Sequence, residues 1–199
     1  MKFITFEGIE GVGKSTQINL IEEWIKSKGL SVKLLREPGS TEFGEIIREL
    51  LLSKKSNINE YTELLLMFSA RSEMIKTHLL NSQEDFILCD RYFHASIAYQ
   101  GYGRNISLDL IDNLIFGTNC PIPNLTIIYD LDVKKGFQRK SKDDDNIDRI
   151  ESSGIDFFER VRKGYQQLAN NREEVKLIDA SQSIELVHEQ TKQIISDLL

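Results

Sequence analysis

The stretch that decides the fold of this 199-residue chain reads Gly8-Ile9-Glu10-Gly11-Val12-Gly13-Lys14-Ser15. It matches the pattern G-x-x-x-x-G-K-[ST], whose spacing lets backbone N–H groups surround a phosphate chain. Residues 2–6 form a short apolar run typical of a buried strand, and residues 16–28 carry isoleucines at helical spacing. Glycines therefore stand where a strand turns into a helix, as close approach to phosphate requires. The stretch predicts a nucleotide phosphate as ligand.

The rest of the chain continues the alternation of strands and helices. Besides residues 2–6, buried strands are expected at residues 31–36, 86–89, 125–131 and 175–178. Amphipathic helices are expected at residues 42–52, 60–80, 107–116, 156–169 and 184–198, with Asn59, Ser107 and Ser183 as N-caps. This alternation predicts one α/β domain over residues 1–199, in which helices cover a parallel sheet. Ligands of such sheets bind outside the carboxyl ends of the strands.

The composition narrows the class of protein. With 40% hydrophobic and 28% charged residues the chain is ordinary for a globular protein, and its net charge of −6 argues against general nucleic-acid binding. No apolar run reaches the length needed to span a membrane, and no leader pattern precedes the first strand. Cys89 and Cys120 lack the spacing of a metal site and are expected to be free thiols. We expect a cytoplasmic protein without a membrane partner.

Distinctive segments follow the predicted strands. They are Arg36-Glu37-Pro38-Gly39-Ser40-Thr41, Asp90-Arg91-Tyr92, Ser96-Ile97-Ala98-Tyr99-Gln100-Gly101 and, later, Asp148-Arg149-Ile150-Glu151. Together with the first motif, this set resembles the thymidylate kinases over nearly the whole chain and in the same order. The resemblance implies a P-loop kinase fold with three layers, a central five-stranded parallel sheet and a mobile lid. It also implies a homodimer that transfers the γ-phosphoryl of ATP to dTMP, giving dTDP for dTTP synthesis.

Phosphoryl transfer requires cations that converge on the phosphates. Lys14 should reach the β and γ phosphates of ATP, and the Ser15 hydroxyl should coordinate Mg²⁺. Asp90, at the end of a strand, is suited to hold the metal or its water shell, although an aspartate there could also cap a helix. The predicted ATP-binding residues are Gly8, Ile9, Glu10, Gly11, Val12, Gly13, Lys14, Ser15 and Thr16.

The acceptor phosphate needs cations of its own. Arg91 should face this phosphate, with Arg36 and Arg71 as further candidates for clamping it. An arginine on a helix is more often a solvated surface charge, so the assignment of Arg71 depends on the resemblance. The same resemblance places Glu10 and Glu37 near the acceptor sugar and phosphate.

Base recognition should combine an aromatic face with polar groups that read the pyrimidine edge. The family places a stacking Phe four residues before the arginine, where this chain has Met67; Phe68 lies three residues before Arg71. We assign Phe68 to the site, with Met67 as the alternative. Ser96 and Gln100 match the thymine readers of the family. Tyr99 matches a residue that disfavours ribonucleotides, and its alternative role is that of an ordinary half-buried tyrosine.

The polar stretch at about residues 138–153 predicts a mobile lid that brings a cation to the transferring phosphoryl group. Arg139 and Arg149 are the candidates for this catalytic cation. One subgroup of the family carries an arginine inside the P-loop, where this chain has Gly11, which implies that the lid supplies the charge. Lys140, Lys142 and the run Asp143–Asp145 are more typical of a solvated loop.

Three other functions compete with this one. A GTP-driven switch would carry Asn-Lys-x-Asp and Asp-x-x-Gly, and neither string occurs. A silent nucleotide-binding module would have lost Lys14, Ser15 or Asp90, and all are present. The main alternative is a related kinase whose acceptor is another deoxynucleotide or a deoxynucleoside, which the Met67 and Phe68 departure keeps open.

Overall fold

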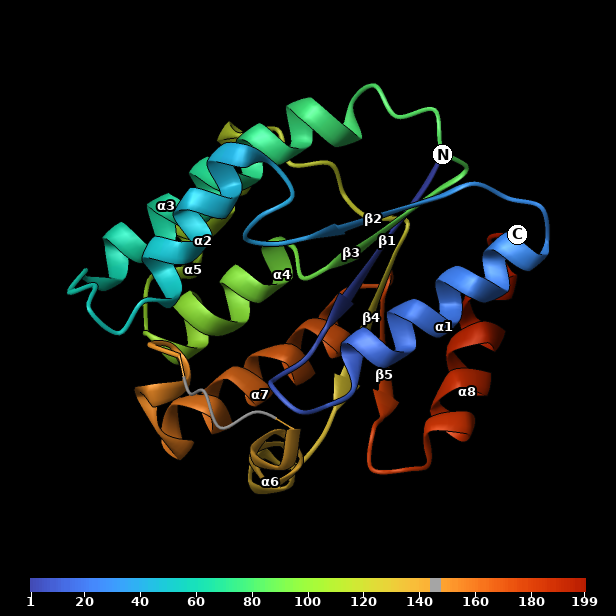
Figure 1. Cartoon of the computed structure of the whole chain (residues 1–199). Coiled ribbons are helices and arrows are strands. Elements are labelled where there is room, and N and C mark those ends of the chain that lie inside the picture. The colour runs from blue at the N-terminus through green and yellow to red at the C-terminus, as the bar shows by residue number, and fades with distance from the viewer. Residues whose placement is uncertain (144–147) are drawn as a thin grey trace.

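A five-stranded parallel sheet forms the centre of the protein (Figure 1). The computed structural model describes residues 1–143 and 148–199, with only the backbone for residues 141–143. The strand order is β2-β3-β1-β4-β5. The strands are β1 (Lys2–Glu7), β2 (Val32–Arg36), β3 (Phe86–Asp90), β4 (Leu125–Asp130) and β5 (Val175–Asp179). The predicted class, a parallel sheet between layers of helices, is confirmed.

Helices cover both faces of the sheet. Figure 1 shows α1 (Lys14–Ser27) and α8 (Ile184–Ser196) side by side on one face. On the other side lie α2 (Glu42–Leu52), α3 (Glu60–Met74) with its π-helical continuation η1 (Ile75–Leu79), α4 (Phe93–Ser96) with its continuation η2 (Ile97–Gly103), α5 (Leu108–Gly117) and α7 (Ile155–Asn171). Two further elements are α6 (Val133–Asp143) and the 3₁₀ turn η3 (Glu151–Ser153). None of the helices described is long and apolar enough to cross a membrane.

Two of the predicted N-caps form the expected hydrogen bonds. The Asn59 side chain accepts from the Thr62 N–H at 2.8 Å, and the Ser183 hydroxyl oxygen accepts from the Leu186 N–H at 3.4 Å. These two predictions are confirmed. Ser107 occupies the N-cap position of α5 without a side-chain hydrogen bond to the helix.

Two helical segments differ from the expectations drawn from the sequence. Residues 93–103 form α4 and η2, but nearly all of their side chains are buried, so they lack the polar face by which an amphipathic helix is recognised. Helix α6 continues to Asp143, whereas the sequence assigns residues from about 138 onwards to an irregular lid. Of that lid, residues 144–147, which include Asp144 and Asp145, lie outside the described residues. The side chains of Lys142 and Asp143 lie outside them as well.

The register of the sheet brings the ends of three strands to one edge. Asp90, the last residue of β3, is paired with Phe6 of β1 and with Arg36 of β2. The segments that follow these strands therefore begin side by side, although they are far apart in the sequence. This edge of the sheet is where the parallel-strand rule places a ligand.

Candidate active site

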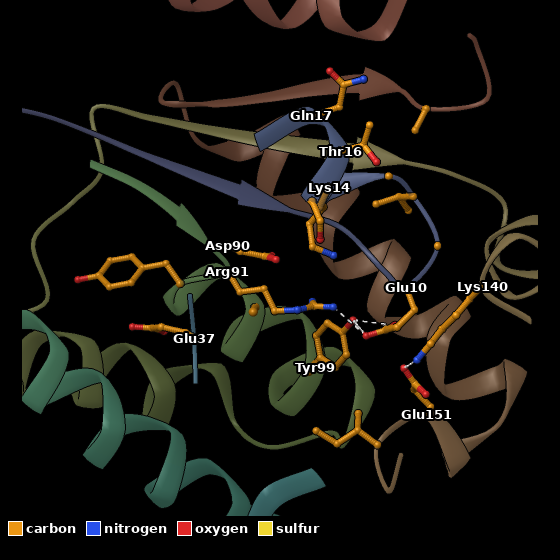
Figure 2. Close-up of a pocket in the computed structure, with 18 of the residues that line it drawn as sticks. Glu10, Lys14, Thr16, Gln17, Glu37, Asp90, Arg91, Tyr99, Lys140 and Glu151 are labelled. Atoms are coloured by element: carbon orange, nitrogen blue, oxygen red, sulfur yellow. Dashed lines mark hydrogen bonds and ion pairs between the residues drawn. The ribbon is translucent and has the colours of Figure 1, made fainter. Parts of the chain in front are cut away.

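A cleft of about 910 Å³ opens at this edge of the sheet. The P-loop, residues 8–15, forms one wall, and the segments that follow β2 and β3 form another. Residues of α2, α3, α4, η2, α6, η3, α8 and the loop between β5 and α8 also contribute to the lining. Figure 2 shows side chains from these separate elements gathered around one space.

Two glycines set the path of the P-loop. Gly8 has φ of +135°, and a Cβ there would lie 2.6 Å from the carbonyl oxygen of Tyr129. Gly13 has φ of +92° and immediately precedes α1. Any other residue would be strained at either position. The loop consequently curls around the N-terminus of α1, whose free N–H groups and dipole favour an anion.

Lys14 directs its ammonium group back into the P-loop. Its Nζ donates hydrogen bonds to the carbonyl oxygens of Gly8 and Ile9, at 3.2 and 3.3 Å. Burial and the nearby Arg91 lower the pKa of Lys14. A bound phosphate would compensate this lysine for its lost hydration, which fits the predicted role. The other predicted ATP-binding residues that line the cleft are Glu10, Gly11, Val12, Gly13, Ser15 and Thr16.

The P-loop is in tight contact with the start of α6. Gly11 has φ of +72°, and a Cβ on it would overlap the carbonyl group of Gly136. In the other direction, a Cβ on Gly136 would lie 2.6 Å from the Glu10 carbonyl oxygen. Position 11 therefore has neither the backbone conformation nor the space for a side chain. Any cation for the transferring phosphoryl group besides Lys14 must therefore come from other elements.

Asp90 is suited to hold a metal ion. Its Oδ1 is buried and has no hydrogen-bond partner among the described residues, and the residue lines the cleft. Ser15 lies on the same cleft. The described residues contain no cluster of three His, Cys, Asp or Glu side chains that could hold a metal alone. One carboxylate and one hydroxyl fit an ion such as Mg²⁺, which takes most of its ligands from water and phosphates.

Arg91 extends across the mouth of the P-loop (Figure 2). It adopts a left-handed backbone conformation, with φ of +69°. Its Nη2 donates to Glu10 Oε1 at 2.7 Å, and its Nη1 donates to the Gly8 carbonyl oxygen at 3.1 Å. The Tyr99 hydroxyl donates to the same Glu10 carboxylate at 2.9 Å, and the Arg91 guanidinium lies 4.8 Å from the centre of the Tyr99 ring. Arg91, Glu10 and Tyr99 thus form one connected group on the cleft.

Glu7 is connected to this group through Tyr165 and the backbone of Tyr92. No sequence motif singles out Glu7. Its fully buried carboxylate accepts hydrogen bonds from the Tyr92 backbone N–H and from the Tyr165 hydroxyl, each at 2.8 Å. The Tyr165 hydroxyl in turn accepts from Arg91 at 3.3 Å. Burial raises the pKa of Glu7 to about 7, although Arg91 and the two hydrogen bonds act in the opposite direction. The bond to the Tyr92 N–H holds the backbone directly after the left-handed Arg91.

Arg71 is not a surface arginine, as its place on a helix would suggest, but a buried residue. Its guanidinium forms a 2.7 Å ion pair with Glu37, and its Nη2 donates to the Ser96 hydroxyl oxygen at 3.1 Å. The Nη1 nitrogen is buried and has no partner among the described residues. Arg71, Glu37 and Ser96 all line the cleft, so an unsatisfied donor belongs to a residue of the cleft wall. Tyr99 and Gln100, also predicted for the site, line the cleft as well.

The structure separates Phe68 from Met67. Phe68 is 2% exposed, lies beneath the Arg71 guanidinium at 4.5 Å from the ring centre, and is outside the described lining of the cleft. Met67 lies on the lining. The predicted stacking role of Phe68 therefore does not agree with its position, because consecutive helical residues point in directions about 100° apart. Of the two residues, it is the alternative, Met67, that lies on the described lining of the cleft.

The predicted Arg36 is absent from the described lining of the cleft, and another arginine, Arg48, lies there. Arg36 ends β2 with a half-exposed side chain, which pairs with Glu45 at 2.8 Å and is absent from the described lining. This placement differs from the predicted phosphate clamp, because the pleat directs Arg36 away from its buried neighbour Leu35. Arg48 of α2 lines the cleft instead and donates to the Pro38 carbonyl oxygen at 3.0 Å. No sequence motif singles out Arg48.

The lid residues divide into two groups. Arg139 and Lys140, both on α6, line the cleft; Arg139 donates to the Ala180 carbonyl oxygen at 2.9 Å, and Lys140 pairs with Glu151. Arg149 is outside the described lining, because its guanidinium donates to Glu63 at 2.6 Å and to the Leu51 carbonyl oxygen at 2.8 Å. Lys140, interpreted from the sequence as solvated, is thus nearer the cleft than Arg149.

The fold and the cleft together define the class of protein. A parallel sheet with a P-loop after its central strand, a strand-terminal Asp90 and several converging cations is the arrangement of a P-loop phosphotransferase. The chain belongs to the thymidylate kinase family, whose family model, described as "Thymidylate kinase", matches residues 6–191.

Individual relatives agree with this assignment. The chain is 43% identical to a thymidylate kinase of Nostoc sp. over 201 residues, which covers 98% of this chain and 95% of that protein. It is 42% identical to a thymidylate kinase of Thermosipho africanus over 198 residues, which covers 97% and 96%. The solved structure of thymidylate kinase from Ehrlichia chaffeensis is similar with a TM-score of 0.80 at 32% identity, and covers 98% of each chain.

Proposed function

We propose that the cleft transfers the γ-phosphoryl group of ATP to dTMP and so produces dTDP for dTTP synthesis. Membership of the thymidylate kinase family supports this reaction. The observation that carries the proposal is the presence of two sets of phosphate-binding groups in one cleft. Lys14 and the P-loop form the first set, and Arg91 with Arg48 belongs to the second. A switch protein or a silent nucleotide-binding module would need only the first.

The ATP half of the site consists of residues 8–16. In our proposal the P-loop N–H groups and Lys14 hold the β and γ phosphates, and the N-terminus of α1 stabilises their charge. Ser15 and Asp90 would hold Mg²⁺ through the hydroxyl and the unpartnered carboxylate oxygen. When bound, this ion neutralises charge on the β and γ phosphates.

The dTMP half lies between α3, η2 and the turn after β3. Arg91 and Arg48 bind the acceptor phosphate, and Arg71 with Gln100 faces the base. Met67 packs on the base in place of an aromatic ring. Glu10, Glu37, Ser96 and Tyr99 hold these groups in position through their hydrogen bonds.

The protein contributes positioning and charge to the transfer. Because the phosphates of the two substrates repel each other strongly, converging cations are needed to bring the acceptor oxygen into line with the γ-phosphorus, and no covalent intermediate is required. Arg139 and Lys140 are the lid cations that lie on the cleft. We therefore assign to Arg139 and Lys140, in preference to Arg149, the role of stabilising the negative charge of the transferring phosphoryl group.

The protein works as one domain in the cytoplasm, in our proposal. One large core joins the sheet to helices from both ends of the chain, and the smaller cluster of Ile47, Leu51 and Ala70 shares the neighbour Met67 with it, which supports one domain over residues 1–199. Cys89 and Cys120 are both free and buried, which fits a reducing compartment. One cooperative unfolding transition is expected for the whole chain; two separable transitions would contradict the single domain.

We propose further that two copies of the chain associate. Phe43, Ile46 and Leu50 form an exposed apolar stripe on α2, at 46, 60 and 42% exposure. Tyr61 and Leu65 on the adjacent α3 are also exposed. Such a patch is unusual on a monomer and is typical of an interface. Sedimentation analysis should show a dimer that Ile46→Asp converts to monomers; a wild-type monomer would refute the proposal.

The reaction is tested by steady-state phosphorylation with Mg²⁺ and ATP. The purified protein is offered dTMP, dUMP, UMP, dCMP, dGMP and thymidine in parallel, with Lys14→Ala as the inactive reference. We expect a strong preference for dTMP. Preference for another nucleotide or for the nucleoside would support the related kinase and overturn our assignment of the acceptor half. Full activity of Lys14→Ala would remove Lys14 from the phosphate site.

A further inference from the structure

A buried carboxylate stands behind the residue that reads the base. Glu63, in the first turn of α3, is 1% exposed. Its Oε1 accepts a hydrogen bond from Gln100 Nε2 at 2.9 Å, and its Oε2 accepts from Arg149 Nη2 at 2.6 Å. Arg104 approaches the two oxygens at 3.4 and 3.3 Å. The Gln100 amide is thus the nearest partner of Oε1, which Arg104 Nε approaches more distantly, whereas both partners of Oε2 are arginines.

This contact determines which way the Gln100 amide points. Although burial acts to raise the pKa of Glu63, the hydrogen bonds from Gln100 and Arg149 and the charge of Arg104 hold this pKa below its ordinary value. Glu63 is therefore an ionised carboxylate, which can accept hydrogen bonds but cannot donate them. The NH₂ group of Gln100 must face Glu63. The carbonyl oxygen Oε1 is then the end of the amide that is left for the cleft, which Gln100 lines.

The orientation has a consequence for the base. Gln100, with its carbonyl acceptor, and Arg71, whose Nη1 is an unpartnered donor, are both lining residues of the cleft. A base with N3–H beside a C4 carbonyl, such as thymine or uracil, complements this pair. Cytosine has a lone pair at N3 and an amino group at C4, so it would set acceptor against acceptor at N3 and donor against donor at C4. Mismatched buried polar groups are a strong source of discrimination.

We propose that Glu63 is a positioning residue that sets the base selectivity of the site by fixing the polarity of the Gln100 amide. The proposal depends on dTMP being the acceptor, as proposed above. Glu63 does not itself contact the base; it acts through Gln100.

The variant Glu63→Gln tests this directly. Arg149 Nη2 and Arg104 Nη2 both donate to the Oε2 position, at 2.6 and 3.3 Å, whereas Arg104 Nε is 3.4 Å from Oε1. The oxygen of the new amide would therefore stay at the Oε2 position, and its NH₂ group would face Gln100. The Gln100 amide would then reverse and present its own NH₂ group to the cleft. We expect KM for dTMP to rise, KM for dCMP to fall, and the ratio of kcat/KM values for the two substrates to drop about tenfold or more, with a smaller change in kcat for dTMP.

The outcomes separate the possible roles of Glu63. An unchanged ratio, or an equal loss for both substrates, would show a structural role only and would overturn the proposal. In a Gln100→Ala background, Glu63→Gln should no longer change the ratio; a further change would also overturn it. If the wild-type protein does not phosphorylate dTMP, the proposed function fails before this comparison is made.

Two further variants serve as controls. Arg104→Gln removes one ion-pair partner but keeps the carboxylate on Gln100, so the ratio should stay as in the wild type. Glu63→Asp keeps the negative charge and shortens the side chain, which weakens the contact with Gln100. It should lower the ratio by a smaller factor and provides the test if Glu63→Gln does not fold; a wild-type ratio in Glu63→Asp would contradict the proposal.

Discussion

Arg91 and Glu10 form a 2.7 Å ion pair at the mouth of the P-loop, and Tyr99 donates a hydrogen bond to the same carboxylate. The pair links the turn after β3 to the phosphate loop, so the cation for the acceptor is placed relative to the donor site. Arg91→Ala should lower kcat/KM for dTMP at least ~10-fold, because a charge-assisted contact with the acceptor phosphate is lost. Arg172→Ala, outside the described cleft lining, is the matched control. Equal activity of the two variants would contradict the role of Arg91.

Arg48 should matter more to the acceptor than Arg36 does. Arg48 lines the cleft, whereas Arg36 forms a half-exposed pair with Glu45. We expect Arg48→Ala to raise KM for dTMP by about tenfold and Arg36→Ala to change it less than about twofold. The measurement is steady-state kinetics at saturating ATP. A larger effect of Arg36→Ala would restore the sequence-based assignment.

Substitutions of Met67 and Phe68, which are neighbours on α3, should affect different properties: substrate binding for Met67 and stability for Phe68. Met67→Ala removes the surface on which we propose that the base packs, so KM for dTMP should rise severalfold while the free energy of unfolding changes little. Phe68→Leu alters a core residue and should cost about 1–2 kcal/mol of stability with a smaller change in KM. Chemical denaturation and kinetics on both variants distinguish them. The reverse pattern would place Phe68 on the base.

The lid arginines should differ in their effect on turnover. Arg139 lies on the cleft, whereas Arg149 is bound to Glu63 and the Leu51 carbonyl oxygen. Arg139→Ala should reduce kcat at least ~10-fold, because a cation near the transferring phosphoryl group acts mainly in the transition state. Arg149→Ala should have the smaller effect on kcat. A greater loss for Arg149→Ala would show that the lid rearranges before transfer.

Glu7 should make stability depend on pH. Its pKa is about 7 in the folded protein against an ordinary value of 4.5. Between these values the folded state holds a proton that the unfolded chain has released. The free energy of unfolding therefore falls as pH rises through this range, by roughly 3 kcal/mol, and this contribution is constant above it. Glu7→Gln should remove the effect.

Denaturation of both proteins at about pH 5 and about pH 8 provides the measurement. Relative to the wild type, Glu7→Gln should gain stability at the higher pH. The same difference in the free energy of unfolding at both pH values would exclude a titrating Glu7.

The sequence predicts the parts of this protein that depend on local sequence patterns. It does not predict which way a side chain points in the fold, or which distant residues meet. The P-loop, the five strands and the caps at Asn59 and Ser183 each have a short, recognisable signature. The choice between Arg36 and Arg48 depends on the pleat of β2, which no motif records. The contacts of Glu7 with Tyr165 and of Glu63 with Gln100 join residues 158 and 37 positions apart. Only the packed chain brings such pairs together.

The close backbone contact between Gly11 and Gly136, here called the seam, limits the routes by which this enzyme can evolve. An arginine in the P-loop would need a different backbone at position 11 and a retreat of α6 from it. A substitution at position 11 alone supplies neither change, because its Cβ would overlap the Gly136 carbonyl group and would be strained at φ of +72°. A lineage with this seam is therefore confined to enzymes whose late-arriving cation is carried by other elements, until insertions or compensating changes have first moved α6.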